Sequence, residues 1–475
     1  MSTPPANVLA GRYASPEMVQ LFSPEHRVVL ERRLWVAVLE AQREQGLDVP
    51  EQVVADYRRV VDEVDLDAIE RRERALRHDV KARLEEFCAL AGHEHAHRGL
   101  TSRDVTENVE QAITRQALAL VRHRMVATLA RLAARATEHA ETVVTGRSHN
   151  VPAQVTTLGK RFANAGEEVL AALDRVDDLL ARFPLRGIKG PVGTQQDQLE
   201  LLGGDPMRVE ALERAVARHL GFDVVLGSVG QVYPRSIDLD VVSALLQATS
   251  GPSSLATTIR LMAGHELVTE GFAEGQVGSS AMPHKMNTRS CERIAALHAV
   301  LRGHLTMVAS IAGDQWNEGD VSCSVVRRVA VPDAFYAADG VYQTLLWVLD
   351  EFAAFPEVID RELRQSLPEL ATTRILGAAV AAGLGREQAH ALIRDHAVAA
   401  AAARRQAEAG GGDLLGRLAD DSDLPLDRDA LERVLDDPLG LAGTAPQQVR
   451  AFVDRVDKIV AEDPAAAAYQ PAPML

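Results

Sequence analysis

The sequence has few cysteines and no long apolar run. Only three cysteines occur among its 475 residues, an odd and low number that argues against a disulfide framework and favours a reducing compartment. No uninterrupted apolar stretch reaches the length of about 18 residues that crosses a membrane. Residues 1–12 lack the basic and apolar regions of a secretion signal. We therefore expect a cytoplasmic protein that does not bind membranes.

The sequence also has fewer basic residues than acidic residues. The chain carries 51 Lys and Arg against 67 Asp and Glu, which gives a formal net charge of −16. General nucleic-acid binding needs a basic surface, so we do not expect nucleic acid as a partner. The apolar fraction of 47% and charged fraction of 25% are ordinary for a globular protein and exclude wholesale disorder.

Long stretches lack both glycine and proline, the residues that most often interrupt helices. Residues 51–91 and 100–145 contain neither. In the second stretch, apolar residues recur at steps of three or four, namely Val109, Ile113, Ala117, Val121, Met125, Leu129 and Leu132. This spacing predicts a helix of about 40 residues, roughly 60 Å long. A helix of that length has to pack along other long helices.

Helical periodicity recurs in residues 167–183, 235–250, 288–302 and 341–355, whereas strand-like alternation is scarce. We therefore predict an all-α fold with a central bundle of long helices. The predicted domains are an N-terminal helical domain over 1–100, the bundle over 101–355 and a C-terminal helical domain over 356–475.

Residues 278–287, Gly-Ser-Ser-Ala-Met-Pro-His-Lys-Met-Asn, hold the densest set of chemically active groups. Two hydroxyls, an amine and an amide lie just before a predicted helix, and a helix N-terminus favours negative charge. The segment is either an anion-binding loop or a plain Gly-Ser connector, and the residues alone leave both interpretations open.

This string resembles the signature of the fumarase/aspartase superfamily, helical lyases that release fumarate. Within the superfamily, segments spread over nearly the whole chain resemble the adenylosuccinate lyase family. The segments are Arg12–Met18, Arg77–Val80, His97, Thr101–Ser102, Thr145–His149, Pro152–Gln154, Gly230–Gln231, Gln315–Trp316 and Arg327–Arg328.

The resemblance implies a β-elimination that cleaves a C–N bond of a succinylated purine nucleotide, with neither cofactor nor metal. It assigns the base to Ser279, the acid to His149 and the carboxylate paired with that acid to Glu292. Lys285 and His78 complete the implied catalytic set. The chemistry agrees, because imidazole titrates near neutral pH and a cation stabilises the charge that develops on the substrate carboxylate.

The resemblance also implies substrate contacts and an assembly. The expected assembly is a homotetramer whose active sites draw residues from several subunits, and long apolar helices fit such an assembly. Arginine suits phosphate and carboxylate groups, but we expect one or two arginines, Arg327 among the candidates, to form only solvated surface ion pairs. The implied substrate contacts are Arg12, Tyr13, Arg77, His78, Asp79, His97, Thr101, Ser102, Gln231, Lys285, Asn287, Arg293, Ser324 and Arg328.

Two positions depart from the family pattern. Gly319 stands where the family often has a substrate-contacting arginine, and Thr288 stands where proline is common. Separately, His93-Glu94-His95-Ala96-His97 has the spacing of a zinc-protease helix. The flanking Gly92 and Gly99 leave little room for a helix, and no third ligand is evident, so we do not expect a metal site there.

Two other functions remain as alternatives. A sister lyase would act, for instance, on argininosuccinate, which has no phosphate for the Arg12-Tyr13 and Arg77-His78-Asp79 segments to bind. A non-catalytic helical assembly protein would not require Ser279 or His149.

Overall fold

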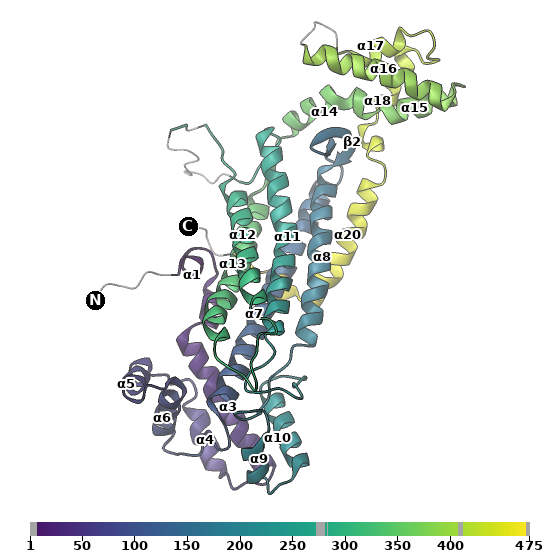
Figure 1. Cartoon of the computed structure of the whole chain (residues 1–475). Coiled ribbons are helices and arrows are strands. Elements are labelled where there is room, and N and C mark those ends of the chain that lie inside the picture. The colour runs from purple at the N-terminus through teal and green to yellow at the C-terminus, as the bar shows by residue number, and fades with distance from the viewer. Residues whose placement is uncertain (1–6, 272–280, 283, 407–411, 472–475) are drawn as a thin grey trace.

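The computed structural model describes residues 7–271, 281–282, 284–406 and 412–471. Long helices lie side by side in an elongated molecule, and smaller groups of helices lie at its two ends (Figure 1). The predicted all-α fold is confirmed. In the described part of the chain, no helix is both long and apolar enough to span a membrane.

The N-terminal part is a set of short helices packed around one longer helix. Residues 51–91 do not form one helix, because the side chains of Asp65 and His78 each cap a new helix start by accepting a backbone N–H. The helices are α1 (Val8–Arg12), α2 (Pro16–Leu21), α3 (Pro24–Glu44), α4 (Glu51–Arg59), α5 (Leu66–Leu76) and α6 (Asp79–Ala91).

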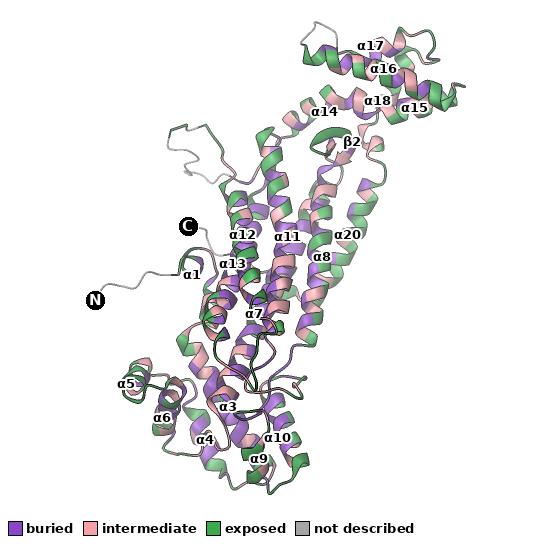
Figure 2. Ribbon diagram, viewed as in Figure 1, coloured by how far each residue is buried: buried purple, intermediate pink, exposed green. Residues whose placement is uncertain are grey.

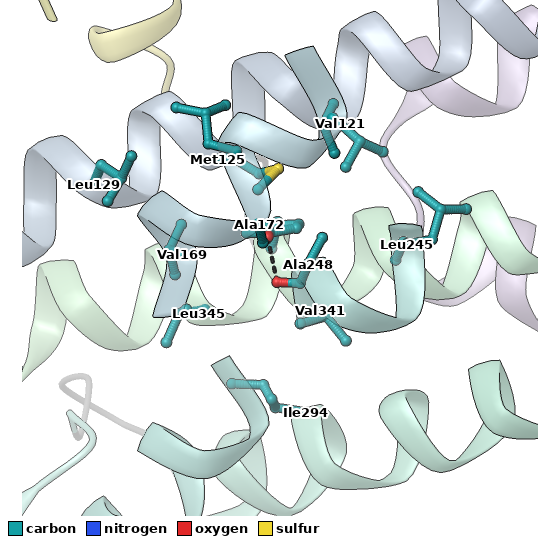
Figure 3. Packing of buried hydrophobic residues seen from close by; sticks show 14 of the residues in the cluster. Val121, Met125, Leu129, Val169, Ala172, Leu245, Ala248, Ile294, Val341 and Leu345 are labelled. Carbon is teal, nitrogen blue, oxygen red and sulfur yellow. Dashed lines mark hydrogen bonds between the residues drawn. The ribbon is translucent and has the colours of Figure 1, made fainter. Parts of the chain in front are cut away.

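The central bundle contains the predicted long helix. Its 37 residues correspond to a length of about 55 Å, and its predicted apolar stripe is buried. Val121, Met125 and Leu129 face side chains of the neighbouring helices (Figure 3). The helices of this part are α7 (Ser102–Glu138), α8 (Leu158–Ala181), α9 (Gln196–Leu201), α10 (Pro206–His219), α11 (Ser236–Gly264), α12 (Arg289–Ala309) and α13 (Cys323–Glu351).

A β-hairpin between α7 and α8 was not predicted. Strands β1 (Val143–Ser148) and β2 (Val151–Thr157) pair antiparallel. His149 and Asn150 form the turn with φ of 53° and 62°, the left-handed conformation of a two-residue hairpin turn. A second short pair joins β3 (Val268–Thr269) to β4 (Ala353–Ala354).

The C-terminal helices extend past one end of the bundle and then return along it (Figure 1). Helices α15–α18 share a small core of their own, and many of their residues are exposed to solvent (Figure 2). Phe452 of α20 returns to the main core against Gly166 of α8. The helices are α14 (Pro356–Leu370), α15 (Thr372–Ala381), α16 (Arg386–Arg405), α17 (Leu414–Ala419), α18 (Arg428–Leu435), α19 (Pro438–Leu441), α20 (Ala445–Glu462) and α21 (Pro464–Ala467).

Candidate active site

Several of the residues expected to bind substrate surround one cavity at the N-terminal end of α7, which we call the α7 cavity. Its volume is about 450 Å³. The predicted residues that line it come from three helix starts: His78 and Asp79 from α6, Ser102 from α7, and Ser324 and Arg328 from α13. A larger cavity of about 850 Å³ lies among α3, α4, α7 and α10, but none of the predicted site residues lines it.

The Arg77-His78-Asp79 segment is held by the junction of α5 and α6. Arg77 ends α5 in the left-handed conformation, with φ of 52°. His78 Nδ1 accepts the Lys81 backbone N–H at 3.2 Å, so the neutral imidazole carries its proton on Nε2. That nitrogen lies 3.4 Å from Ser102 Oγ. His78 is therefore both a helix cap and a donor that faces the α7 cavity.

His97 is fixed by Trp35. The Trp35 indole N–H donates to His97 Nδ1 at 3.1 Å, which again leaves the imidazole proton on Nε2. Burial lowers the pKa of His97 and keeps the ring neutral, although Asp104 opposes the shift. Residues 93–97 form no helix, and His93 instead contacts Asp56 at 3.0 Å. The helical geometry that a zinc-protease motif requires is absent from this segment.

The start of α7 is anchored by a buried ion pair. Arg186 Nη1 donates to Asp104 Oδ1 at 2.7 Å, and both side chains are fully buried. The other Asp104 oxygen accepts the Thr101 N–H at 2.8 Å, which completes a capping box at the helix N-terminus. Arg186 also donates to the Gly230 carbonyl at 2.9 Å, so the pair links Thr101 and Ser102 to the loop that carries Gln231.

The two adjacent arginines of α13 have different surroundings. Arg327 is buried and donates to Asp238 at 2.7 Å, and it also contacts Glu110 and Tyr233. Arg328 is exposed, lines the α7 cavity and makes no hydrogen bond or ion pair with any described residue. We expected some candidate arginines to form only solvated surface ion pairs, but the ion pairs of Arg327 lie in the interior.

Gly319 lies where the family often has an arginine, and its backbone is unsuited to a side chain. Its φ is 137°, and an added Cβ would lie 3.1 Å from Gln231 Cβ. The Gln231 N–H donates to the Glu318 carbonyl at 2.6 Å, which brings the two loops together. In this chain the loop packs against Gln231 where the family pattern has a long cation.

His149 lies far from the α7 cavity within one chain. It occupies the exposed tip of the β1–β2 hairpin, and this hairpin follows the C-terminal end of α7, whereas Ser102 begins that helix. The strand β2 lies near the end of the bundle that carries α14 (Figure 1). The hairpin is tied to α14 by Arg147, whose Nη2 lies 2.7 Å from Glu362 Oε1. The distance of about 55 Å along α7 excludes contact between His149 and the α7 cavity of the same chain.

The signature segment and the start of α12 form a third group. Ser279 lies outside the described residues, and Lys285 and Asn287 lie just before α12. Glu270 caps α12 by accepting the Ser290 and Cys291 N–H groups at 2.9 and 2.8 Å. The helix N-terminus that we expected to favour an anion therefore already holds a carboxylate of the chain itself.

Two predicted residues of α12 contact partners within the same chain. Glu292 lies 3.5 Å from the Arg260 guanidinium. The Arg293 guanidinium lies 5.5 Å from the centre of the Tyr13 ring, and Arg12 is the last residue of α1, next to Tyr13. Because α12 is 21 residues long, its first turn lies roughly 30 Å from its other end. The predicted residues thus belong to three parts of the chain, the α7 cavity, the tip of the β1–β2 hairpin and the start of α12.

The sequence interpretation missed several residues that line the α7 cavity: Arg27, Val80, Arg83, Arg103, Thr106 and Glu110. Arg83 follows Asp79 by four residues on a predicted helix, and this spacing was the one available signal. Arg27 lies on α3, and no pattern in the sequence relates it to the cavity.

Comparison with known proteins places this chain among lyases, and both family profiles and full-length relatives agree on this. The sequence profile of the family described as "Lyase" matches residues 14–303, and that of "Adenylosuccinate lyase C-terminus" matches residues 368–452. Adenylosuccinate lyase of Saccharomyces cerevisiae is 36% identical over 453 residues, covering 94% of this chain and 93% of the yeast protein. The enzyme of Schistosoma mansoni is 33% identical over 455 residues, covering 94% of both chains.

Solved structures share the fold. The 3-carboxy-cis,cis-muconate lactonizing enzyme from Pseudomonas putida superposes with a TM-score of 0.81 at 19% identity, covering 96% of this chain and all of that one. The fumarate lyase from Mesorhizobium sp. superposes with a TM-score of 0.79 at 23% identity, covering 95% of this chain and all of that one. At these identities the likeness concerns the fold alone.

Proposed function

The chain belongs to the adenylosuccinate lyase family, and on that premise we propose that it cleaves adenylosuccinate to AMP and fumarate by β-elimination. The second proposed substrate is the succinylated aminoimidazole carboxamide ribotide of purine synthesis. One observation carries the proposal: His78, Ser102 and Arg328, far apart in the sequence, line a single cavity. The resemblance had assigned all three to the substrate.

We propose that the reaction begins with removal of a proton from the carbon next to a substrate carboxylate. Ser279 acts as the base, and Lys285 stabilises the negative charge that develops on the carboxylate oxygens. His149, oriented by Glu292, protonates the leaving nitrogen. In this proposal no cofactor or metal ion takes part.

The α7 cavity is proposed to bind the anionic substrate. The protein has a net charge of −16, so an anion needs local positive charge. Arg328 supplies a guanidinium without an ion-pair partner among the described residues, and His78 and Ser102 supply polar hydrogens beside it. Arginine binds two oxygens of a phosphate or carboxylate at once.

We further propose that a homotetramer completes each active site. Within one chain, the hairpin that carries His149 lies about 55 Å from the α7 cavity, so a complete site needs residues from other copies. Exposed apolar side chains on the bundle support such contacts. Val325 and Val329 of α13 are 71% and 46% exposed, Leu261 of α11 is 50% exposed, and Val300 of α12 is 38% exposed.

The rival functions are less well supported. Argininosuccinate carries no phosphate and would leave part of the cationic wall unused. A non-catalytic assembly protein would have no need of an unpaired arginine in a cavity. We also propose a cytoplasmic location, because Cys88, Cys291 and Cys323 are all free thiols, as is usual in a reducing compartment.

The test is to mix the purified protein with adenylosuccinate and to follow fumarate release by its ultraviolet absorbance. Argininosuccinate serves as the control substrate. The proposal expects fumarate from adenylosuccinate and none from argininosuccinate. Fumarate from the control alone would establish the sister activity, and release from neither would refute a lyase of this class.

A further inference from the structure

Behind the α7 cavity lies a buried carboxylate to which the resemblance assigns no role. Glu31 of α3 has no exposed surface, and its Oε2 accepts a hydrogen bond from Arg83 Nε at 2.5 Å. Its other oxygen, Oε1, is buried and has no hydrogen-bond partner in the described part of the chain. An unsatisfied buried carboxylate oxygen is costly, so its retention needs an explanation.

Arg83 joins this carboxylate to the cavity. Its Nη2 donates to Asp79 Oδ2 at 3.0 Å, and its side chain lines the α7 cavity together with Asp79 and His78. Its remaining nitrogen, Nη1, makes no hydrogen bond with any described residue. The Arg83 guanidinium thus contacts the buried Glu31 and orients Asp79, a predicted substrate contact. Its Nη1 edge stays available to a ligand in the α7 cavity.

We propose that Arg83 is a further substrate-binding residue, whose free edge meets a carboxylate or phosphate group of the substrate, and that Glu31 is the residue that positions it. The inference rests on the proposed function and adds two residues to its binding site. The hydrogen bond from Arg83 Nε to the buried Glu31 keeps the guanidinium plane at the cavity wall. The hydrogen bond from Nη2 then keeps Asp79 in a fixed position beside it.

A comparison with Asp104 distinguishes this pair from an ordinary structural ion pair. Both Asp104 oxygens are occupied: Oδ1 accepts from Arg186 and from the Lys189 and Gly190 backbone, and Oδ2 accepts from Thr101. Asp104 therefore fixes the backbone at Thr101, Lys189 and Gly190. Among the described residues, the one hydrogen-bond and ion-pair partner of Glu31 is the side chain of Arg83, and a buried ion pair is often no more stabilising than apolar residues of the same size. Stability alone gives a weak reason for the Glu31–Arg83 pair.

The ionisation of Glu31 provides an independent readout. Burial raises its pKa to about 7, although Arg83 of α6 and Arg27 of its own helix lower it, and Asp79 raises it further. The carboxyl therefore changes charge near neutral pH, and this change alters the net charge shared by Glu31, Arg83 and Asp79. Substrate affinity should follow that titration, whereas an ion pair that serves only stability would not move it.

The experiment compares steady-state kinetics with adenylosuccinate across pH 6 to 9 for six proteins: wild type, Arg83→Gln, Glu31→Leu, the Arg83→Gln/Glu31→Leu double variant, Glu31→Gln and a control. Arg83→Gln should raise KM by roughly 10-fold or more with a smaller change in kcat, because it removes a charge-assisted contact. Glu31→Leu should raise KM similarly, and the double variant should be no worse than Arg83→Gln. Glu31→Gln keeps an acceptor for Arg83, so it should retain a low KM but lose the inflection of kcat/KM near pH 7.

The control is Glu210→Gln, which breaks an exposed ion pair with Arg214 and should leave all parameters unchanged.

A second measurement separates this inference from the proposed function: the rise in melting temperature caused by inorganic phosphate or succinate. Wild type should show the rise and Arg83→Gln should lose most of it, even if wild type released no fumarate. If Arg83→Gln keeps both its KM and the anion-dependent rise, or if neither anion stabilises wild type, the inference is overturned. Where Glu31→Leu fails to fold, Arg83→Gln and the Glu31→Gln pH profile still decide.

Discussion

Ser102 and His149 lie at opposite ends of one helix, α7. Ser102 is the first residue of α7, and His149 is at the tip of the hairpin that follows its last turn. The helix has 37 residues, so the two side chains are separated by roughly 55 Å. A single substrate cannot touch both in one chain. If both act in the same reaction, as we propose, the protein must use them from different copies.

The first prediction concerns the proposed acid and base. We expect His149→Ala and Ser279→Ala each to lower kcat by at least about 10²-fold, because each removes a proton-transfer group. The melting temperature of His149→Ala should stay unchanged, since His149 is exposed at a turn. His390→Ala, at an exposed histidine of α16, is the matched control and should keep full activity. Near-normal turnover in either variant would contradict the role assigned to that residue.

The second prediction separates two neighbouring arginines. Arg327→Met should destabilise the fold by about 3–5 kcal/mol, because it leaves the buried Asp238 without its ion-pair partner and removes one of the two partners of the half-buried Glu110. Burial opposes the ionisation of Glu110, but Arg327 and Arg27 hold its pKa at about 2. Thermal and denaturant unfolding measure the loss.

Arg328→Met should weaken substrate binding and leave the stability of the fold unchanged. We expect an unchanged melting temperature and a KM raised by about 10- to 100-fold, the loss of one hydrogen-bonded charge contact of about 1.5–3 kcal/mol. A destabilised Arg328→Met protein with normal KM would show that the exposed side chain supports the fold instead of the substrate.

The third prediction concerns pH and the buried His304. Both of its ring nitrogens are buried without a hydrogen-bond partner in the described residues, and burial lowers its pKa below the ordinary 6.5 although Asp333 opposes this. The unfolded chain therefore binds the proton more readily, and this histidine costs stability as pH falls through 6.5 towards its folded pKa.

His304→Leu removes that cost. We expect the variant to be at least as stable as wild type at pH 8 and to gain stability relative to wild type as the pH is lowered to about 5.5, by roughly 1 kcal/mol or more. Unfolding curves at several pH values measure the difference. A constant difference across this range would show that His304 does not titrate on unfolding.

The fourth prediction concerns the missing family arginine. Gly319→Arg should not create a new substrate contact, because φ of 137° and the nearby Gln231 leave no relaxed place for a side chain. We expect a loss of stability of about 1–3 kcal/mol and a higher KM. Gly377→Ala, in a helix where the added Cβ meets no atom within 4 Å, is the control and should stabilise the protein by up to about 1 kcal/mol. A lower KM in Gly319→Arg would contradict this account.

The sequence predicted those parts of the fold whose signal is local and repeated. Helix α7 was predictable because its apolar residues keep a helical period without interruption over many turns. The β1–β2 hairpin was not, because Gly146 and Pro152 break its alternation and its burial depends on packing against α14.

The candidate site shows the same division. The His78 and Ser102 motifs were recognisable as short strings, and the fold brings them together at the α7 cavity. Neither the opposite environments of Arg327 and Arg328 nor the contact between Glu31 and Arg83 could be predicted. These depend on how helices cross, which single-residue patterns do not encode.

The central claim is that one active site draws on more than one copy of the chain, and a mixing experiment tests it most directly. Inactive Ser279→Ala and His149→Ala proteins are combined in equal amounts, dissociated and reassembled, and fumarate release from adenylosuccinate is measured. If the two residues of a site come from different subunits, random assembly restores about one native site in four, so we expect activity near a quarter of wild type. Activity that stays at the level of the separate variants would contradict the account.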